Sequence, residues 1–384
     1  MKVVFLSNYY NHHQSSFSME MNKLTDNGFY FIETAEMTME RKSLGYEIEK
    51  PKFVLQYYEK EQKDYCINLI NEADVVIYGS APYSLIVNRL KQEKLTLIYS
   101  ERLFKKKYAY LKVLILMLGG KNYKHYSKYK NAYLLCASAF SSYDYNRLGA
   151  FKNKAFKWGY FPPIKEYKVD DFIKSKTPNS ILWCGRFIDW KHPEYAIEVA
   201  KRLKSDGYNF SLNIIGTGEL ESTLKETVAK NGLERNVKFL GAMKPTEVRE
   251  NMEKSSIYLF TSDKGEGWGA VLNEAMNSAC AVVSSHAIGA TPYLIKDKEN
   301  GLIFKSEDIK DLYNKVKYLL DNEEKAKEIG KKAYETIVNE WNAKNAANKL
   351  IVLIKNLLKG EKCTELYNEG VCSKSIVIKD NWYK

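Results

Sequence analysis

The sequence predicts an α/β protein built from two successive domains, each with a parallel sheet covered by helices on both faces. The chain has 384 residues, of which 45% are apolar, and this is enough to bury two cores of ordinary size. Short apolar runs alternate with helical stretches along the chain, as in parallel sheets connected by helices. The alternation restarts after Phe161-Pro162-Pro163 and a polar segment ending at Asn179. Two α/β units are therefore favoured over one continuous sheet.

The expected strands are short, apolar and bounded by polar or turn residues. In the first half of the chain they are 2–7, 29–34, 74–80, 95–100 and 131–138. In the second half they are 180–186, 210–218, 236–241, 256–262 and 279–285, with a helical run over 193–207 between the first two. Apolar residues recur at helical spacing through much of 308–358. We therefore expect domains at 1–165 and 166–340, a C-terminal helix at 341–360 and a tail of uncertain structure at 361–384.

The composition limits the classes of partner. A formal net charge of +12 favours nucleic acid, anionic lipid or phosphorylated small molecules, and no nucleic-acid recognition motif accompanies it, so we predict no nucleic-acid partner. No apolar run reaches the roughly 20 residues that span a bilayer, and the opening residues lack the features of a secretory signal. We expect a cytoplasmic protein. The six cysteines are scattered without a C-x-x-C pair, so we predict no metal site.

The window Ser262 to Met276, SDKGEGWGAVLNEAM, carries the strongest functional signal. It follows an expected strand and opens a helix, so its glycines can turn the chain and expose backbone N–H groups at a helix N-terminus. This outlines a phosphate-binding turn. Glu266 lies in the turn and Glu274 two helical turns later, so two carboxylates can face one ligand and accept hydrogen bonds from sugar hydroxyls. The plain alternative is a loop glutamate and a solvated helix glutamate.

A second window, Cys184 to Pro193, also follows directly after an expected strand. Arg186 offers a planar fork of donors and Lys191 a mobile point charge. Together they can neutralise a diphosphate and stabilise it as a leaving group, so that no metal would be obligatory. Either residue alone could equally be a surface cation.

These windows resemble the motifs of GT-B glycosyltransferases of family 4, the large retaining family. The resemblance rests on Gly185-Arg186 through Lys191 (GR-x4-K), on Ile215-Gly216-Thr217-Gly218 (I-G-x-G), and on Glu266 through Glu274 (E-x7-E). It implies two Rossmann-like domains facing across a cleft, with acceptor binding in the first, nucleotide-sugar binding in the second, and a last helix that returns to the N-terminal domain. A Rossmann dehydrogenase is disfavoured, because the G-x-G-x-x-G expected after the first strand is absent.

The resemblance also assigns roles to individual residues. Arg186 and Lys191 would hold the donor diphosphate, Glu266 would bind the transferred sugar and Glu274 the ribose hydroxyls. The remaining donor-binding candidates contribute backbone groups or close packing, and Leu240 lies at the strand end that lines the base; they are Gly185, Gly216, Gly218, Leu240, Gly267, Trp268, Gly269, Ala270 and Val271. Arg186, Lys191 and Glu266 are the predicted catalytic residues, and the donor is expected to be a nucleoside diphosphate sugar without an obligatory cofactor.

On the acceptor side, the polar run Asn8 to Gln14 follows the first expected strand, where open α/β sheets bind ligands. His12 and His13 are candidates for contact with acceptor or donor phosphate; alternatively they cap the following helix or are exposed. Many relatives have a glycine-rich turn here, and this chain departs from it.

Residues 102–130 carry nine Lys or Arg and no Asp or Glu, interleaved with apolar and aromatic residues. Such a segment suits binding to an anionic membrane surface, and a polyprenyl-diphosphate-linked sugar would then be a natural acceptor. Equally, it suits a core-facing helix with a solvated basic rim.

The function predicted is transfer of a hexose from a nucleoside diphosphate sugar to an acceptor hydroxyl, with retention, on a lipid-linked or growing surface polysaccharide. Two alternatives remain: a non-catalytic, membrane-associated protein that binds sugar nucleotides, and a GT-B sugar-nucleotide epimerase.

Overall fold

The structure is a computed structural model that describes residues 1–43, 45–105, 111, 126 and 128–383. It divides into two compact units. The N-terminal unit consists of Met1–Pro163 and Glu340–Lys379, and the C-terminal unit of Ile164–Asn339 and Asp380–Lys384.

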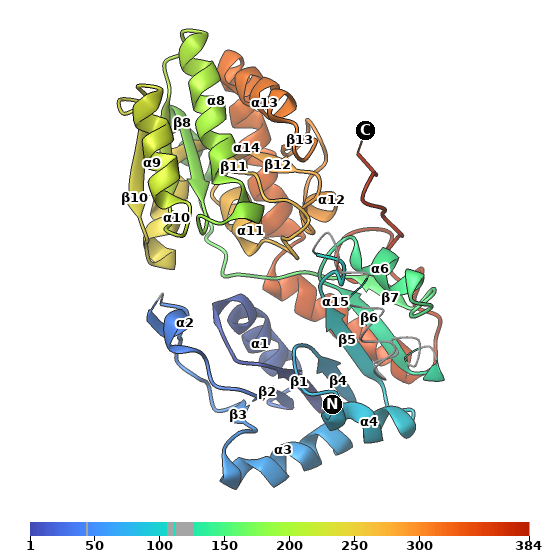
Figure 1. The fold of residues 1–384 in the computed structure, drawn as a ribbon. Coiled ribbons are helices and arrows are strands. Elements are labelled where there is room, and N and C mark those ends of the chain that lie inside the picture. The colour runs from blue at the N-terminus through green and yellow to red at the C-terminus, as the bar shows by residue number, and fades with distance from the viewer. Residues whose placement is uncertain (44, 106–110, 112–125, 127, 384) are drawn as a thin grey trace. The chain divides into compact units, whose positions relative to one another are not determined.

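The N-terminal unit contains a parallel sheet with the strand order β3-β2-β1-β4-β5-β6-β7 in the part of the chain described (Figure 1). The strands are β1 (Val3–Ser7), β2 (Phe29–Glu33), β3 (Val54–Gln56), β4 (Val75–Tyr78), β5 (Thr96–Ser100), β6 (Ala132–Cys136) and β7 (Ala155–Lys157). Strands β1, β2 and β4 are buried along nearly their whole length, as expected for a parallel sheet covered on both faces.

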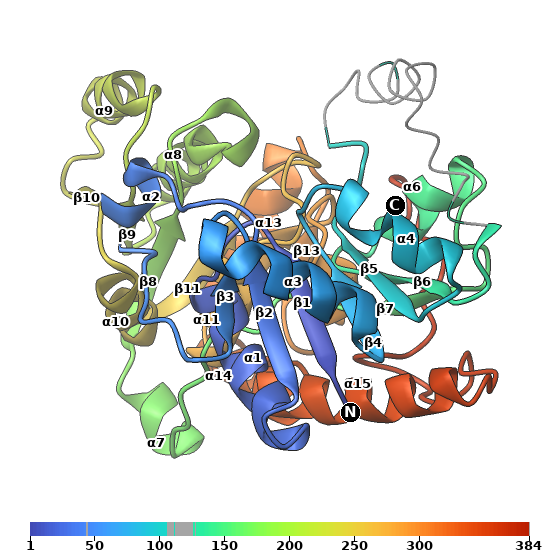
Figure 2. The ribbon, with the colours of Figure 1, turned by 90° about the horizontal axis from the view of Figure 1, so that it is seen from below.

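Helices cover this sheet on both sides. They are α1 (His12–Leu24), α2 (Met39–Ser43), α3 (Lys60–Glu72), α4 (Ser84–Lys91), α6 (Ser141–Arg147) and α15 (Ala343–Leu358). The last helix, α15, begins at the cap Asn342, whose side chain accepts the N–H of Asn345 at 2.9 Å, and its apolar face packs against α1 (Figure 2). The C-terminal segment of the chain thereby completes the core of the N-terminal unit.

The C-terminal unit repeats the topology, with the order β10-β9-β8-β11-β12-β13 in a second parallel sheet. Its strands are β8 (Thr177–Cys184), β9 (Ser211–Ile215), β10 (Val237–Gly241), β11 (Ser255–Phe260), β12 (Ala281–Ser285) and β13 (Leu302–Phe304). In each unit the first strand of the unit is the third in this order, and the order reverses beside it: between β1 and β4, and between β8 and β11.

The helices of the C-terminal unit form two layers (Figure 1). Helices α8 (Pro193–Ser205), α9 (Glu221–Lys230) and α13 (Ile309–Asp321) pack in one layer, and α10 (Pro245–Lys254), α11 (Ala270–Asn277) and α14 (Glu323–Asn339) in the other. Three shorter helices are α7 (Val169–Lys174), the 3₁₀ turn η2 (Asp189–Lys191) and α12 (Thr291–Leu294). The first layer buries one face of β8 and β11, including Trp183 and Leu259.

The tail at 361–384, for which the sequence predicted no definite structure, makes defined contacts. Lys157 N–H donates to the carbonyl of Ser373 at 2.7 Å, and Cys372 N–H to that of Lys157 at 2.9 Å, so the tail runs antiparallel along the edge strand β7. Pairing of this kind protects an exposed sheet edge. Within the C-terminal unit, Trp382 Nε1 donates to the carbonyl of His286 at 3.1 Å.

The ten predicted strands are all present, and three further ones were not predicted. The missed strands, β3, β7 and β13, have three residues each and lie at the sheet edges. Strands of that length carry too few alternating positions to be recognised from the sequence. No helix among the described residues is long and apolar enough to cross a membrane.

Candidate functional site

The two strongest sequence motifs meet at the switch point of the C-terminal sheet. Strands β8 and β11 are hydrogen-bonded neighbours with Trp183 beside Leu259, and the strand order reverses between them. Open parallel sheets bind ligands outside the carboxyl ends of the strands at such a point. The loop carrying Arg186 and Lys191 follows β8, and the loop carrying Glu266 follows β11.

Lys191 and Glu266 form an ion pair. Lys191 Nζ lies 2.5 Å from Glu266 Oε2, and their side chains are only 15% and 13% exposed. The Lys191 ammonium also lies 4.8 Å from the centre of the Trp190 ring, and Ser262 Oγ donates to the same carboxylate oxygen at 3.3 Å. Two predicted residues that are 75 positions apart thus share one polar centre.

Arg186 is not part of this pair. Its side chain is exposed, and within the described residues no hydrogen bond or ion pair engages its guanidinium. The backbone of Arg186 is nevertheless fixed, because the next residue, Phe187, is buried and donates its N–H to the carbonyl of Thr217 at 2.9 Å.

Helix α11 begins at this place with a glycine cap. Gly269 has a φ of 90°, and a Cβ atom there would lie 2.4 Å from the Phe260 ring, so no other residue fits without strain. The first turn contains no acidic side chain, and the N–H groups of Ala270 and Val271 belong to the helix positions that lack an intrahelical acceptor. Such a helix N-terminus attracts anions.

Glu274 lies on the second turn of α11 and is partly buried. Burial raises the pKa of its carboxyl to about 7, against the opposing influence of the Arg249 guanidinium. Among the described residues the carboxylate has neither a hydrogen-bond donor nor an ion-pair partner. A carboxylate in such a setting is suited to accept hydrogen bonds from the hydroxyl groups of a ligand.

Trp268 presents no ring to a ligand. The residue is fully buried, and its indole N–H donates to Asn273 Oδ1 at 2.9 Å. The ring therefore packs in the interior of the unit. Its predicted contact through the backbone amide, together with that of Gly267, stays a prediction.

The glycines of the I-G-x-G motif are required by close packing of loops. A Cβ atom on Gly216 would lie 1.9 Å from the carbonyl oxygen of Gly185, and one on Gly218 2.5 Å from that of Phe187. Their φ angles, 138° and 156°, also disfavour other residues. These glycines therefore let the loop after β9 lie against the loop that carries Arg186. Leu240 is partly buried on β10, beside β9.

The structure adds residues that the motifs did not indicate. His192 adopts a left-handed conformation with φ 51°; its Nδ1 lies 2.8 Å from Glu194 Oε1 and its Nε2 3.8 Å from Asp263 Oδ2. Burial lowers the pKa of this imidazole, but the two carboxylates outweigh burial and raise it to about 9. His192 is therefore a cation at neutral pH. The sequence could have indicated this residue, because His192 directly follows Lys191.

In the N-terminal unit, His12 and His13 are the first two residues of α1. They do not cap it, since Asn11 does: its side chain accepts the N–H of His13 at 2.9 Å. The centres of the two rings lie 3.9 Å apart, and the His13 ring stacks on that of Tyr160. Burial lowers the pKa values to about 4 for His12 and about 3 for His13. Both alternatives considered from the sequence, capping and exposure, are therefore wrong, and the rings are neutral.

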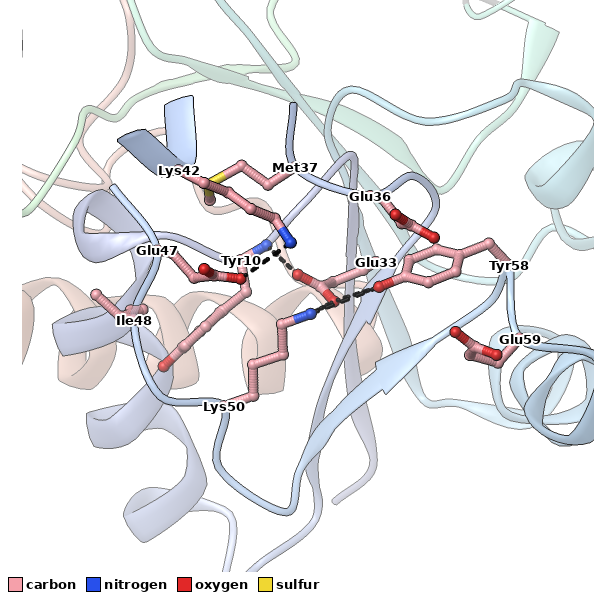
Figure 3. Close-up of a pocket in the computed structure, with 10 residues that line it drawn as sticks. All are labelled: Tyr10, Glu33, Glu36, Met37, Lys42, Glu47, Ile48, Lys50, Tyr58 and Glu59. Carbon is pink, nitrogen blue, oxygen red and sulfur yellow. Dashed lines mark hydrogen bonds and ion pairs between the residues drawn. The ribbon is translucent and has the colours of Figure 1, made fainter. Parts of the chain in front are cut away.

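A pocket of about 120 Å³ lies near these histidines, at the carboxyl end of β2 (Figure 3). Its buried centre is Glu33, which accepts the N–H of Tyr10 and the ammonium of Lys50, each at 2.7 Å. The pocket is lined by charged and partly apolar side chains from four segments, namely Tyr10, Glu33, Glu36, Met37, Lys42, Glu47, Ile48, Lys50, Tyr58 and Glu59. One signal in the sequence was overlooked: Glu33 is an acid at the last position of a buried strand.

The basic stretch 102–130 lies largely outside the described residues. Its first residue, Arg102, is buried, lies 3.5 Å from Asp144 Oδ1 through Nη2, and stacks over the Phe140 ring. Arg102 therefore belongs to the interior and not to a solvated basic rim. Across the described part of the chain, no group of three His, Cys, Asp or Glu side chains is placed to hold a metal ion; whether catalysis needs a metal stays a prediction.

The fold is that of the GT-B glycosyltransferases. TarM from Staphylococcus aureus matches 92% of this chain and 98% of its own at a TM-score of 0.69 and 13% identity. HepE from Anabaena, in complex with UDP, matches 93% of this chain and 100% of its own at 0.67 and 14%. At such identities the likeness concerns the fold alone, and it confirms the predicted fold class.

Residues 165–336 match the family model of glycosyl transferases group 1. This region contains every donor-site candidate. The narrower assignment to family 4 stays a prediction.

Curated relatives point in the same direction. The poly(ribitol-phosphate) α-N-acetylglucosaminyltransferase of Staphylococcus aureus is 27% identical over 50% of this chain and 39% of its own length. The amylovoran biosynthesis glycosyltransferase AmsK of Erwinia amylovora is 30% identical over 54% of this chain and 52% of its own. The chain thus spans about half, or less, of the length of these relatives.

Proposed function

We propose that the protein is a retaining glycosyltransferase that moves a hexose from a nucleoside diphosphate sugar to a hydroxyl of a lipid-linked or growing surface polysaccharide. The observation that carries the proposal is the meeting of Lys191, Glu266, Glu274 and the N-terminus of α11 at one switch point. It is supported by the family match over this region and by the curated relatives that are glycosyltransferases of surface polymers.

Each group suits one part of such a donor. The N–H groups at the start of α11 and the Lys191 ammonium neutralise the diphosphate, and Arg186, exposed and unengaged, closes on it from the neighbouring loop. Glu274 accepts the ribose hydroxyls and Glu266 a hydroxyl of the transferred sugar. For this, the Lys191–Glu266 pair opens: the cation turns to the diphosphate and the carboxylate to the sugar.

The chemistry proposed is departure of the nucleoside diphosphate with attack by the acceptor hydroxyl on the same face of the sugar. Lys191 and Arg186 stabilise the negative charge that develops on the leaving group. The departing phosphate takes the proton of the acceptor hydroxyl, so that neither Glu266 nor another carboxylate has to act as a nucleophile. No metal is required for charge neutralisation.

For the acceptor, the pocket around Glu33 favours hydroxyl groups over phosphate. Four glutamates line it against two lysines, and the neutral rings of His12 and His13 add no positive charge nearby. Carboxylates and tyrosine hydroxyls hydrogen-bond to neutral saccharides, whereas they repel a phosphorylated group. We therefore expect the accepting end to be an uncharged sugar, whatever carrier holds it.

Thermal unfolding with a panel of nucleoside diphosphates, UDP first, tests the donor site. We expect one base to raise the unfolding temperature, and the shift to be absent from Glu274→Ala and much reduced in Arg186→Ala. Absence of a shift for every nucleotide in the native chain would overturn the proposal.

Product analysis separates the proposal from its rivals. Incubation of the donor with an acceptor panel, followed by NMR of the anomeric proton, is expected to yield the retained anomer. Conversion of the free donor without acceptor would indicate an epimerase, and donor binding without turnover across the panel would indicate a non-catalytic binding protein.

A further inference from the structure

The inference concerns how Lys191 is held in place, and it rests on the function proposed above. We propose that Thr261 is a positioning residue: its hydroxyl, clamped by the indole of Trp183, joins the loop after β11 to the loop after β8 and thereby sets the place of Lys191 opposite Glu266. Neither Thr261 nor Trp183 belongs to the motifs read from the sequence.

The contacts form a short buried chain. Trp183 Nε1–H donates to Thr261 Oγ1 at 2.8 Å, and the Thr261 hydroxyl donates to the carbonyl of Lys191 at 2.7 Å, with the carbonyl of His192 at 3.0 Å. Trp183 is 2% exposed and Thr261 1%. Since the indole N–H occupies an acceptor site of the hydroxyl, the hydroxyl proton is left to the loop carbonyls, and its direction is fixed.

A second contact ties the same two loops two residues further on. Asp263 N–H donates to the carbonyl of Trp190 at 3.0 Å, and Asp263 Oδ1 in turn accepts the N–H of Gly265 at 2.6 Å. The loop after β11 is therefore attached to the loop after β8 at Thr261 and again at Asp263, shortly before Glu266. The close approach of Lys191 Nζ and Glu266 Oε2 follows from these backbone attachments.

The loop needs such an attachment, because its own backbone does not fix the lysine. Lys191 ends the single 3₁₀ turn η2, and His192 reverses the chain in a left-handed conformation that non-glycine residues rarely adopt. Short 3₁₀ turns and left-handed residues persist where their surroundings hold them. The Thr261 hydroxyl contacts the carbonyls of these two residues directly.

Thr261→Val tests the hydroxyl with little change of shape, and Thr261→Ser restores it. Since valine leaves the Lys191 carbonyl and the indole N–H unpaired, we expect kcat/KM for the donor to fall about tenfold in Thr261→Val and to stay within about threefold of native in Thr261→Ser. Thr25→Val is the matched control: Thr25 is also buried and its hydroxyl also donates to a backbone carbonyl, that of Met21 at 2.8 Å, but in the N-terminal unit.

The dependence on Lys191 separates positioning from a general loss of stability. When Lys191→Met is already present, adding Thr261→Val should lower kcat/KM by no more than about twofold. The reason is that the Lys191 ammonium, which Thr261→Val displaces, is already absent. Multiplicative losses in the double variant, or native kinetics in Thr261→Val, would overturn the inference.

Amide hydrogen exchange supplies a readout that needs no substrate. We expect faster exchange over residues 186–193 and 261–267 in Thr261→Val and in Trp183→Phe, and native exchange in Thr261→Ser and Thr25→Val. Unchanged exchange in both loops would overturn the positioning role even if the transferase activity stands. Altered exchange in a chain that binds no nucleotide would instead leave the loop attachment standing and refute the function proposed above.

Discussion

The switch points of the two units have the same topology and opposite chemistry. In the C-terminal unit the loops after β8 and β11 place charged groups together, with Lys191 against Glu266 and His192 between two carboxylates. In the N-terminal unit the loop after β1 leads to two adjacent histidines that burial keeps neutral. Strand order thus brings the loops together, and the loop residues set the charge that they present. On the function proposed above, one unit would suit an anion and the other neutral hydroxyls.

The largest expected effect is on the charged pair of the C-terminal unit. We expect Lys191→Met and Glu266→Gln each to lower the rate of sugar transfer by a factor on the order of 10²–10³, since one removes stabilisation of the leaving group and the other a contact to the sugar. Initial rates of product formation measure this. The control is Lys225→Met, which breaks an exposed pair with Glu221 in the same unit; comparable losses in all three variants would mean that the charged centre has no special role.

Substitution of Gly216 is expected to disrupt the close packing of the loops after β8 and β9. In Gly216→Ala the new Cβ atom would clash with the Gly185 carbonyl, and we expect the unfolding free energy to fall by about 3 kcal/mol or more. Gly207→Ala is the comparison, because Gly207 also has a positive φ, of 80°, but nothing lies within 4 Å of its Cβ position; there we expect about 1 kcal/mol. Denaturant unfolding followed by tryptophan fluorescence measures both, and equal losses would show that conformation alone, and not loop contact, requires Gly216.

We expect Glu274 to make nucleotide binding depend on pH. Its pKa is raised to about 7, so between pH 6 and pH 8 the carboxyl changes from mainly protonated to mainly ionised. If the ionised form accepts the ribose hydroxyls, affinity for the nucleotide should rise by up to about tenfold over this range. Isothermal titration at several pH values measures the change. Glu274→Gln retains the titration of the nucleotide phosphates and removes that of the carboxyl, so an unaltered pH profile in this variant would contradict the assignment.

The smallest expected effect is on the pH dependence of stability through the histidines. Their titration compares the two units directly. In a proton NMR titration, His12 and His13 should remain neutral down to about pH 4 and pH 3, while His192 should stay charged up to about pH 9. The folded-state pKa of His12 lies below that of the unfolded chain, so stability falls as the pH is lowered from about 6.5 through about 4. For a half-buried ring we expect a loss of about 1–2 kcal/mol, which His12→Phe should abolish. Ordinary titration of both rings near pH 6.5 would show that the N-terminal site is not neutral.

The sequence by itself determined the fold class and the central strands. Buried parallel strands contain nearly continuous apolar runs, such as 3–7 and 257–260, and this pattern is local. The motifs after β8, β9 and β11 were also recognisable, since a glycine-rich turn or a helix start requires particular residues in sequence. The edge strands β3, β7 and β13 were missed because their pairing partners, and not their three residues, make them strands.

Only the tertiary structure decided which side chains meet. The pairing of Lys191 with Glu266, the clamp of Trp183 on Thr261 and the burial of Glu33 among Tyr10 and Lys50 each join residues far apart in the chain. The same is true of the pKa values, because the neutrality of His12 and the positive charge of His192 come from burial and from neighbouring carboxylates. The physical reason is that a strand or a glycine turn follows from local sequence, whereas contact, desolvation and charge pairing arise when the order of the strands brings distant loops to one edge of a sheet.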